Sequence, residues 1–190
     1  MLLLVGLGNP GSSYTNTRHN IGFKIIDAIN AHFKLSKQKP KFKGLLTTGN
    51  IDEKKIYAIK PLTFMNNSGT AIKELIDYFK IDAKDVFVFH DDMDIDFGKI
   101  KAKFGGSSAG HNGIESIDKF IGKDYSRVRI GIGHPKQKKK VNNHVLEDFK
   151  EDEEEKINEI TDNIVRQLPT LIEKKIDLFS SKVNQDLNGI

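Results

Sequence analysis

The run of apolar residues Leu2–Val5 near the start of the chain limits the fold most strongly. Four consecutive apolar side chains in a strand point to both faces of a sheet, so such a strand needs helices on both faces. A second run of this kind, Val86–Phe89, follows in the middle of the chain. These runs predict buried strands between two helical layers.

Predicted strands alternate with predicted helices along the whole chain, which favours an α/β fold. The other strands are expected at residues 45–48, 56–60, 99–104 and 128–133, and helices are expected directly after residue 16 or 17 and from residues 67, 113 and 147. We therefore predict a three-layer α/β/α sandwich with a twisted mixed, mainly parallel sheet. No linker is evident, so residues 1–190 are expected to form a single domain with carboxyl-terminal helices from about residue 147, interrupted at Pro169.

Composition excludes several classes of protein. The chain has 190 residues and no cysteine, which rules out disulfides and thiolate chemistry. It shows no secretory signal and no apolar run near the roughly 20 residues of a membrane span, so a cytoplasmic protein is expected. A formal charge of +4 permits a polyanionic partner without requiring one.

The polar segment after the first strand has two possible interpretations. Asn16 or Thr17 is expected to cap the first helix, with His19 in its first turn. The glycines of this segment also match G-x-G-x-x-G, the dinucleotide-binding pattern. That pattern requires the helix to open within the glycine run, whereas Pro10 and a long polar stretch delay it. The dinucleotide interpretation is therefore disfavoured.

Polar residues suited to hydrolysis follow several predicted strands. They are Asn9, His19, Asn66, Asp91 and Asn112. Because ligands bind beyond the carboxyl ends of strands in open α/β sheets, these residues are expected to share one site. A histidine oriented by a carboxylate is a suitable general base, and asparagine amides can stabilise an oxyanion. No nucleophilic side chain is evident, so water is the expected attacking group.

Each of these residues also has a structural interpretation. Asn9 and Asn66 are typical turn or capping residues, and His111 is either a loop histidine or a secondary candidate for the site. Asp91, Asp92 and Asp94 suggest a metal site, but adjacent strand residues point to opposite faces and no metal-binding spacing follows. No metal is therefore expected.

Six motifs in order resemble bacterial peptidyl-tRNA hydrolases across roughly the first three quarters of the chain. They are residues 6–11 (GLGNPG), Tyr14 with 17–22 (TRHNIG), 60–61 (KP) with 63–69 (TFMNNSG), 90–94 (HDDMD), 110–113 (GHNG) and 129–135 (RIGIGHP). Phe64 stands where some relatives carry tyrosine. The last quarter of the chain, from Glu147, has no matching motif.

The resemblance implies an enzyme that cleaves the ester between a peptide and the 3′ ribose of tRNA and so recycles the tRNA. It makes His19 the proton acceptor and Asp91 the group that stabilises its basic form, while Asn9 discriminates blocked from free aminoacyl ends. It assigns the remaining site residues to binding: Tyr14, Phe64, Asn66 and Asn112 to the tRNA 3′ end and peptide, and Lys101, Lys103 and Arg129 to acceptor-stem phosphates. The family needs no cofactor and is usually monomeric.

Two rival functions stay open at this point. Relatives of the family keep its fold and act as non-catalytic RNA-binding proteins, although the presence of His19, Asp91 and Asn9 argues against this alternative. A metal-dependent phosphoesterase using Asp91 and its neighbouring carboxylates would lose its activity in a chelator.

Overall fold

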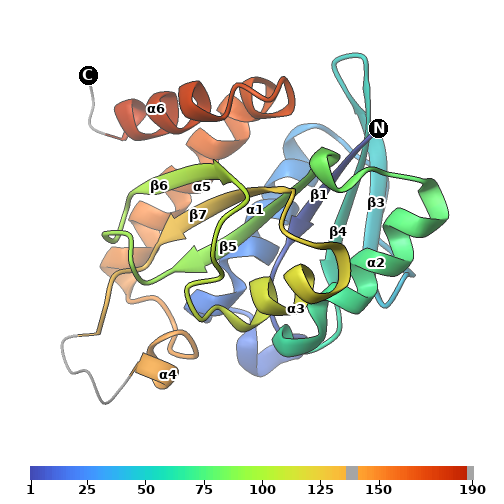
Figure 1. The fold of residues 1–190 in the computed structure, drawn as a ribbon. Helices are drawn as coiled ribbons and strands as arrows, with labels where there is room; N and C mark the ends of the chain where they lie inside the picture. Colours follow the sequence, from blue (N-terminus) through green and yellow to red (C-terminus); the bar gives the residue numbers. More distant parts are fainter. Residues whose placement is uncertain (136–140, 188–190) are drawn as a thin grey trace.

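The computed structural model describes residues 1–135 and 141–187. Its centre is a seven-stranded sheet with the strand order β2-β3-β4-β1-β5-β7-β6 (Figure 1). The strands are β1 Leu2–Gly6, β2 Lys39–Lys41, β3 Gly44–Ile51, β4 Lys54–Pro61, β5 Val86–Asp92, β6 Ile100–Phe104 and β7 Ser126–Gly131. The four central strands, β4, β1, β5 and β7, run parallel, and the outer strands pair antiparallel. The predicted mixed sheet is confirmed.

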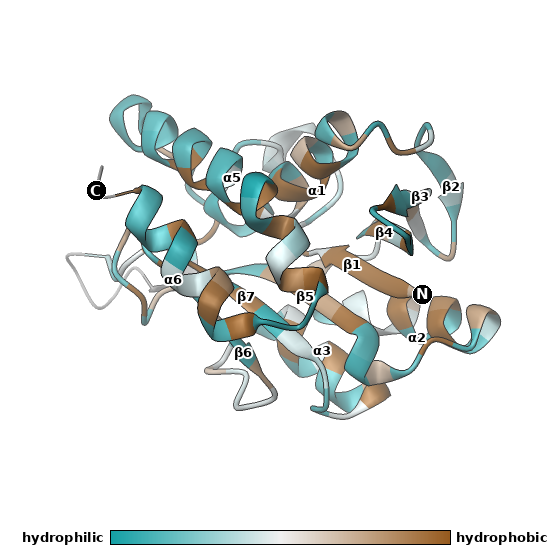
Figure 2. Ribbon diagram, turned by 90° about the horizontal axis from the view of Figure 1, so that it is seen from above, coloured by the Kyte–Doolittle hydropathy of each residue, from teal (hydrophilic) through white to brown (hydrophobic). Residues whose placement is uncertain are grey.

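Helices cover both faces of this sheet. They are α1 Ile21–His32, α2 Ser68–Phe79, α3 Asn112–Ile121, α4 Val141–His144, α5 Glu151–Ile172 and α6 Ile176–Asp186. Figure 2 shows α1, α5 and α6 on one side of the sheet and α2 and α3 on the other. The three-layer α/β/α arrangement predicted from the sequence is therefore confirmed. No helix in the described part of the chain is both long and apolar enough to cross a bilayer.

Strand β1 lies at the centre of both apolar cores. Leu2 and Leu4 belong to the core beneath α1, α5 and α6, whereas Leu3 and Val5 belong to the core beneath α2 and α3. The side chains alternate between the two faces, as they must in a strand. This explains why the run contains no polar residue.

The start of α1 packs directly against the ends of β1 and β5. A Cβ atom at Gly22 would lie 2.3 Å from the backbone nitrogen of Leu7 and 2.4 Å from the backbone oxygen of Phe89, so a larger residue would push the helix away. The nitrogen of Leu7 also donates to that Phe89 oxygen at 3.1 Å. This close approach brings the turn before α1 to the carboxyl edge of β5.

The predicted capping of the first helix is wrong. A short 3₁₀ turn, Arg18–Asn20, precedes α1, which begins only at Ile21. The Thr17 hydroxyl donates to the carbonyl of Tyr14 and caps nothing. The backbone nitrogens of Arg18 and His19 donate instead to the carbonyls of Glu147 and Val145. Partners from a distant segment thus replace the local cap.

The predicted helix break at Pro169 is also wrong, since α5 continues to Ile172. Proline removes one hydrogen bond, to the carbonyl four residues earlier. Leu168, Leu171 and Ile172 are nevertheless all buried in the core on this face of the sheet. Their burial offsets the missing bond, and the helix ends four residues later than the prediction.

Candidate active site

A cavity of about 570 Å³ opens at the carboxyl ends of β1 and β5. Its walls come from the loop after β1, the turn before α2, the end of β5, the loop before α3 and the segment after α4. Five residues proposed from the sequence line it together: Asn9, His19, Asn66, Asp91 and Asn112. The sheet order explains this gathering, because β1 lies between β4 and β5.

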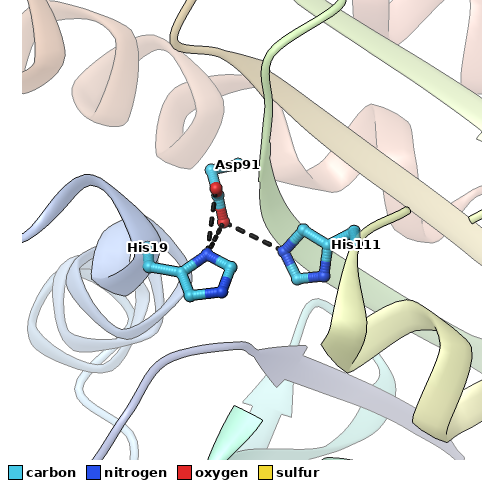
Figure 3. Close-up of side chains that lie close together, drawn as sticks. All are labelled: His19, Asp91 and His111. Carbon is cyan, nitrogen blue, oxygen red and sulfur yellow. Dashed lines mark hydrogen bonds and ion pairs between the residues drawn. The ribbon is translucent and has the colours of Figure 1, made fainter. Parts of the chain in front are cut away.

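His19 and Asp91 form a buried hydrogen-bonded pair in this cavity (Figure 3). Nδ1 of His19 lies 2.8 Å from Oδ1 and 3.0 Å from Oδ2 of Asp91. A carboxylate can only accept, so Nδ1 carries the proton and the neutral ring keeps its lone pair on Nε2. The two side chains are 8% and 2% exposed. The pair has the geometry of a general base with its orienting carboxylate.

Asp91 is ionised although it is buried. Burial by itself would raise its pKa, but the adjacent rings of His19 and His111 outweigh burial by electrostatic attraction and by the hydrogen bonds of their N–H groups. Nε2 of His111 lies 3.0 Å from Oδ1 of Asp91, the same oxygen that the His19 ring contacts (Figure 3). The pKa of Asp91 is consequently held far below its usual value.

Three of the four polar groups of Asn9 are held by hydrogen bonds within the protein. Its side-chain Oδ1 accepts from the backbone nitrogen of Met65 at 2.8 Å. Its backbone nitrogen and oxygen both bond to the side chain of Asn20, each at 2.9 Å. The remaining group is the side-chain NH₂, which has no hydrogen-bond partner among the described residues. It is an N–H donor available to a ligand in the cavity.

The other proposed binding residues differ in position. Asn66 precedes α2, Asn112 begins α3, and both are exposed residues that line the cavity. Phe64 also lines it and is 59% exposed. Tyr14 does not line it but contacts Phe64 edge-on, with ring centroids 6.4 Å apart. The two rings therefore form an aromatic rim beside the site.

The three proposed phosphate-binding residues lie on neighbouring strands. Lys101 of β6 is directly opposite Arg129 of β7, and Lys103 is two residues further along the same side of its strand. Both lysines are exposed. Nε of Arg129 donates at 2.7 Å to Asp92, which lines the cavity. The basic strip thus adjoins the cavity through this ion pair.

Metal binding is not favoured by the donor set. Within residues 1–135 and 141–187, the group of three possible ligands that converges is His19, Asp91 and His111. The imidazole nitrogens that face Asp91 carry protons, so they offer the carboxylate N–H groups and present no lone pair to an ion. Asp92 bonds to Arg129 and Asp94 to His134, so these carboxylates do not converge with Asp91.

Several residues that shape the site escaped the sequence analysis. Asn20 holds the backbone of Asn9, and its place directly after His19 in the motif TRHNIG was a signal that could have identified it. Arg18 is buried and donates to the carbonyls of His144 and Glu147 and to Glu153, which ties the segment after α4 to the turn bearing His19. No motif near residues 144–153 indicated this contact.

Comparison with known proteins gives a consistent result. The family model described as peptidyl-tRNA hydrolase matches residues 3–189. A peptidyl-tRNA hydrolase of Pelagibacter ubique (strain HTCC1062) is 72% identical over 184 residues, which cover 97% of this chain and 99% of that protein. One from Ehrlichia ruminantium (strain Welgevonden) is 46% identical, with 95% and 93% covered.

The solved structures agree with the sequence comparison. The crystal structure of peptidyl-tRNA hydrolase from Acinetobacter baumannii superimposes with a TM-score of 0.90 at 34% identity, and the match covers 97% of this chain and 94% of that one. The resemblance seen in the motifs therefore extends over the fold and nearly the whole length, including the last quarter. The chain belongs to the peptidyl-tRNA hydrolase family.

Proposed function

We propose that this chain hydrolyses the ester that joins a peptide, or an N-blocked amino acid, to the 3′ ribose of tRNA. The reaction releases free tRNA for reuse in translation. The observation that carries the proposal is the pair formed by His19 and Asp91, whose geometry leaves Nε2 of the imidazole as a base beside a cavity of about 570 Å³. A water molecule next to Nε2 is the nucleophile.

The proposed reaction has two steps. Nε2 of His19 takes a proton from water as the oxygen attacks the ester carbonyl, and Asp91 stabilises the imidazolium that forms. The tetrahedral intermediate then collapses, and the imidazolium returns a proton to the leaving 3′ oxygen of the ribose. The peptide leaves as a carboxylic acid and the tRNA leaves with a free hydroxyl.

Amide donors supply the remaining chemistry in this proposal. Asn66 and Asn112 reach the cavity from the amino ends of α2 and α3, where their N–H groups can hold the substrate carbonyls and the oxyanion. The NH₂ group of Asn9 reads the carbonyl of a blocked amino end, which a free α-amine lacks. The aromatic rim of Tyr14 and Phe64 stacks on the 3′ end of the tRNA.

The strip formed by Lys101, Lys103 and Arg129 is the proposed contact with the acceptor stem. Because Arg129 uses Nε for Asp92, its two terminal nitrogens remain for phosphate oxygens. Such contacts give affinity without sequence information, which suits an enzyme that accepts many tRNAs. The partner is peptidyl-tRNA, the site of action is the cytoplasm, and the chain acts as a monomer of one domain without a cofactor.

The decisive assay is the release of N-acetyl amino acid from N-acetyl-aminoacyl-tRNA in the presence of a metal chelator. We expect rapid release, with unblocked aminoacyl-tRNA left intact as the control substrate. Loss of activity in chelator would favour a metal-dependent mechanism instead. Binding of tRNA without any hydrolysis would favour a non-catalytic RNA-binding protein.

A further inference from the structure

The His111 ring is held by hydrogen bonds on both of its nitrogens. Nδ1 accepts from the backbone nitrogens of Gly113 at 3.1 Å and Ile114 at 3.3 Å, so the side chain caps α3. Nε2 lies 3.0 Å from Oδ1 of Asp91. The side chain is 9% exposed. One ring therefore connects a helix terminus to the carboxylate of the candidate base pair.

These contacts determine the tautomer of His111. A backbone N–H can only donate, so Nδ1 must be unprotonated and the proton of the neutral ring lies on Nε2. That proton is donated to Asp91. A second proton on Nδ1 would break both bonds to the helix and leave the first N–H groups of α3 without their cap. The bonds to the helix thus leave Nε2–H as the group that faces Asp91.

Asp91 depends on this donor for its orientation. Among the described residues, its side chain is bonded only by the rings of His19 and His111. Oδ1 receives a bond from each ring, and Oδ2 receives one from His19 alone. With His111 removed, the carboxylate would be free to turn about its last side-chain bond, and the His19 ring would turn with it.

The loop before His111 is fixed to the sheet as well. Arg127 of β7 is 3% exposed, and its two terminal nitrogens donate to the carbonyls of Ser107 and Gly105. A buried arginine bonded to two carbonyls of the loop ties the loop to the sheet. His111 therefore approaches Asp91 from a rigid support on both sides, the loop and the helix.

We propose that His111 is a positioning residue for hydrolysis that acts through Asp91. Its Nε2–H fixes the carboxylate that orients His19, while its Nδ1 fixes the start of α3, which carries Asn112. The inference rests on the proposed function, since it assumes that His19 is the base. It adds that the basic form of His19 and the position of Asn112 are set by the same imidazole.

Two substitutions separate the two roles of the ring. In His111→Asn the amide is near the place of Nδ1 and asparagine is a favoured cap, but the side chain is too short to reach Asp91. In His111→Gln the amide nitrogen is near the place of Nε2 and can donate to Asp91, but the cap is poorer. We expect His111→Asn to keep the melting temperature and lose about 10-fold or more in kcat.

His111→Gln should behave in the opposite way. We expect it to recover most of that rate and to melt lower by about 2–4 °C, the effect of one lost cap in a chain of this size. His32→Asn, a change at an exposed histidine, is the control for both variants. If both His111 variants instead lose rate in proportion to their stability, His111 is a helix cap alone and the proposal is wrong.

The pH profile of kcat/KM gives a second readout, which a purely structural role would not change. In His111→Asn the carboxylate that orients His19 loses one of its two ring partners, so the acidic limb should differ from that of wild type. The other charged or titratable groups near this network are His90, Arg127, Asp92 with Arg129 and Asp94 with His134. These groups are the same in wild type and variant, so their effects on the pH profile cancel in the comparison. An unchanged acidic limb would count against the proposal.

The tautomer can be tested without any activity measurement. ¹⁵N NMR spectra of histidine-labelled protein should show the His111 signal as the neutral Nε2–H form, and the signal should disappear in His111→Asn. An Nδ1–H or charged form would overturn the proposal. Other results would contradict the proposed function itself. They are a wild-type protein that does not hydrolyse the substrate, or a His19→Ala variant that still hydrolyses it.

Discussion

The His19 ring has one nitrogen bonded to Asp91 and the other at the cavity, and this asymmetry predicts the effect of removing it. His19→Ala should reduce kcat by about 10²-fold or more, because the proton acceptor is lost. Affinity for tRNA and the melting temperature should remain close to wild type. Single-turnover hydrolysis and filter binding measure the two effects, with His32→Ala as the control. Near-normal turnover would show that another group is the base.

Asn9 should determine selectivity rather than rate. Its Oδ1 is bound to Met65, so its NH₂ group is the part that meets the substrate. In Asn9→Asp the bond to Met65 is kept while the donor becomes an acceptor, which attracts a free α-amine and repels a carbonyl. The ratio of cleavage of N-acetyl-aminoacyl-tRNA to aminoacyl-tRNA should therefore fall. Equal losses on both substrates would assign Asn9 to the structure of the loop.

The buried His90 makes the fold sensitive to acid. Its Nδ1 donates to the carbonyl of Asp91 at 2.7 Å, and burial together with the nearby His111 lowers its pKa well below the usual 6.5. Below about pH 6.5 the unfolded chain binds a proton at this residue that the folded chain does not. The free energy of unfolding therefore decreases with falling pH, by about 1.4 kcal/mol per pH unit for one proton.

His90→Asn tests this contribution, because an asparagine amide can replace the Nδ1 donor and does not titrate. Denaturant unfolding from about pH 6.5 to about pH 5 should show a shallower loss of stability than in wild type. His32→Asn, which removes an exposed histidine, should leave the slope unchanged. If the His90→Asn slope equals the wild-type slope, other groups cause the acid sensitivity.

At the scale of elements, the edge strand β6 is the part of the sheet that we assign to tRNA affinity. Lys103→Ala should weaken the binding of many tRNAs to a similar extent and reduce the salt dependence by roughly one unit of slope. A minimal substrate with only the 3′ nucleotide and peptide should be cleaved at the wild-type rate.

Lys55→Ala is the matched control for Lys103→Ala. Lys55 is an exposed strand lysine near the amino end of β4, whereas the cavity lies at the carboxyl ends of the parallel strands. This variant should bind tRNA as wild type does. Equal losses from both substitutions, or loss of the minimal substrate in Lys103→Ala, would mean that the β6 lysine is ordinary surface charge.

At the scale of the molecule, one sheet separates and supports two cores, so we expect the chain to unfold as a single domain. Calorimetric and van't Hoff enthalpies should agree. Phe179 of α6 is fully buried, and Phe179→Ala should cost about 3–5 kcal/mol within that same transition. Lys182→Ala, an exposed change on the same helix, is the control. A separate early transition in Phe179→Ala would make the terminal helices an independent unit.

The sequence by itself determined the three-layer arrangement of helices and sheet and the residue types of the candidate site. Runs such as Leu2–Val5 reveal burial on both faces, and helical spacing reveals the helices, because these periodicities are local properties of the chain. The motif residues at the strand ends determined the family resemblance, and the rule for strand ends predicted that Asn9, His19 and Asp91 would meet. The sequence could not decide which of the neighbouring histidines join them.

Only the tertiary structure decided those contacts, because they depend on strand order and on distant partners. His90 precedes Asp91 in the chain yet is buried and does not line the cavity, whereas His111 reaches Asp91 from the start of α3. The backbone of the segment 145–147, not a local cap, holds the turn with His19. The propensity for helix or strand depends on a few neighbouring residues. A hydrogen bond between residues 72 positions apart, by contrast, forms only after the sheet has brought them together.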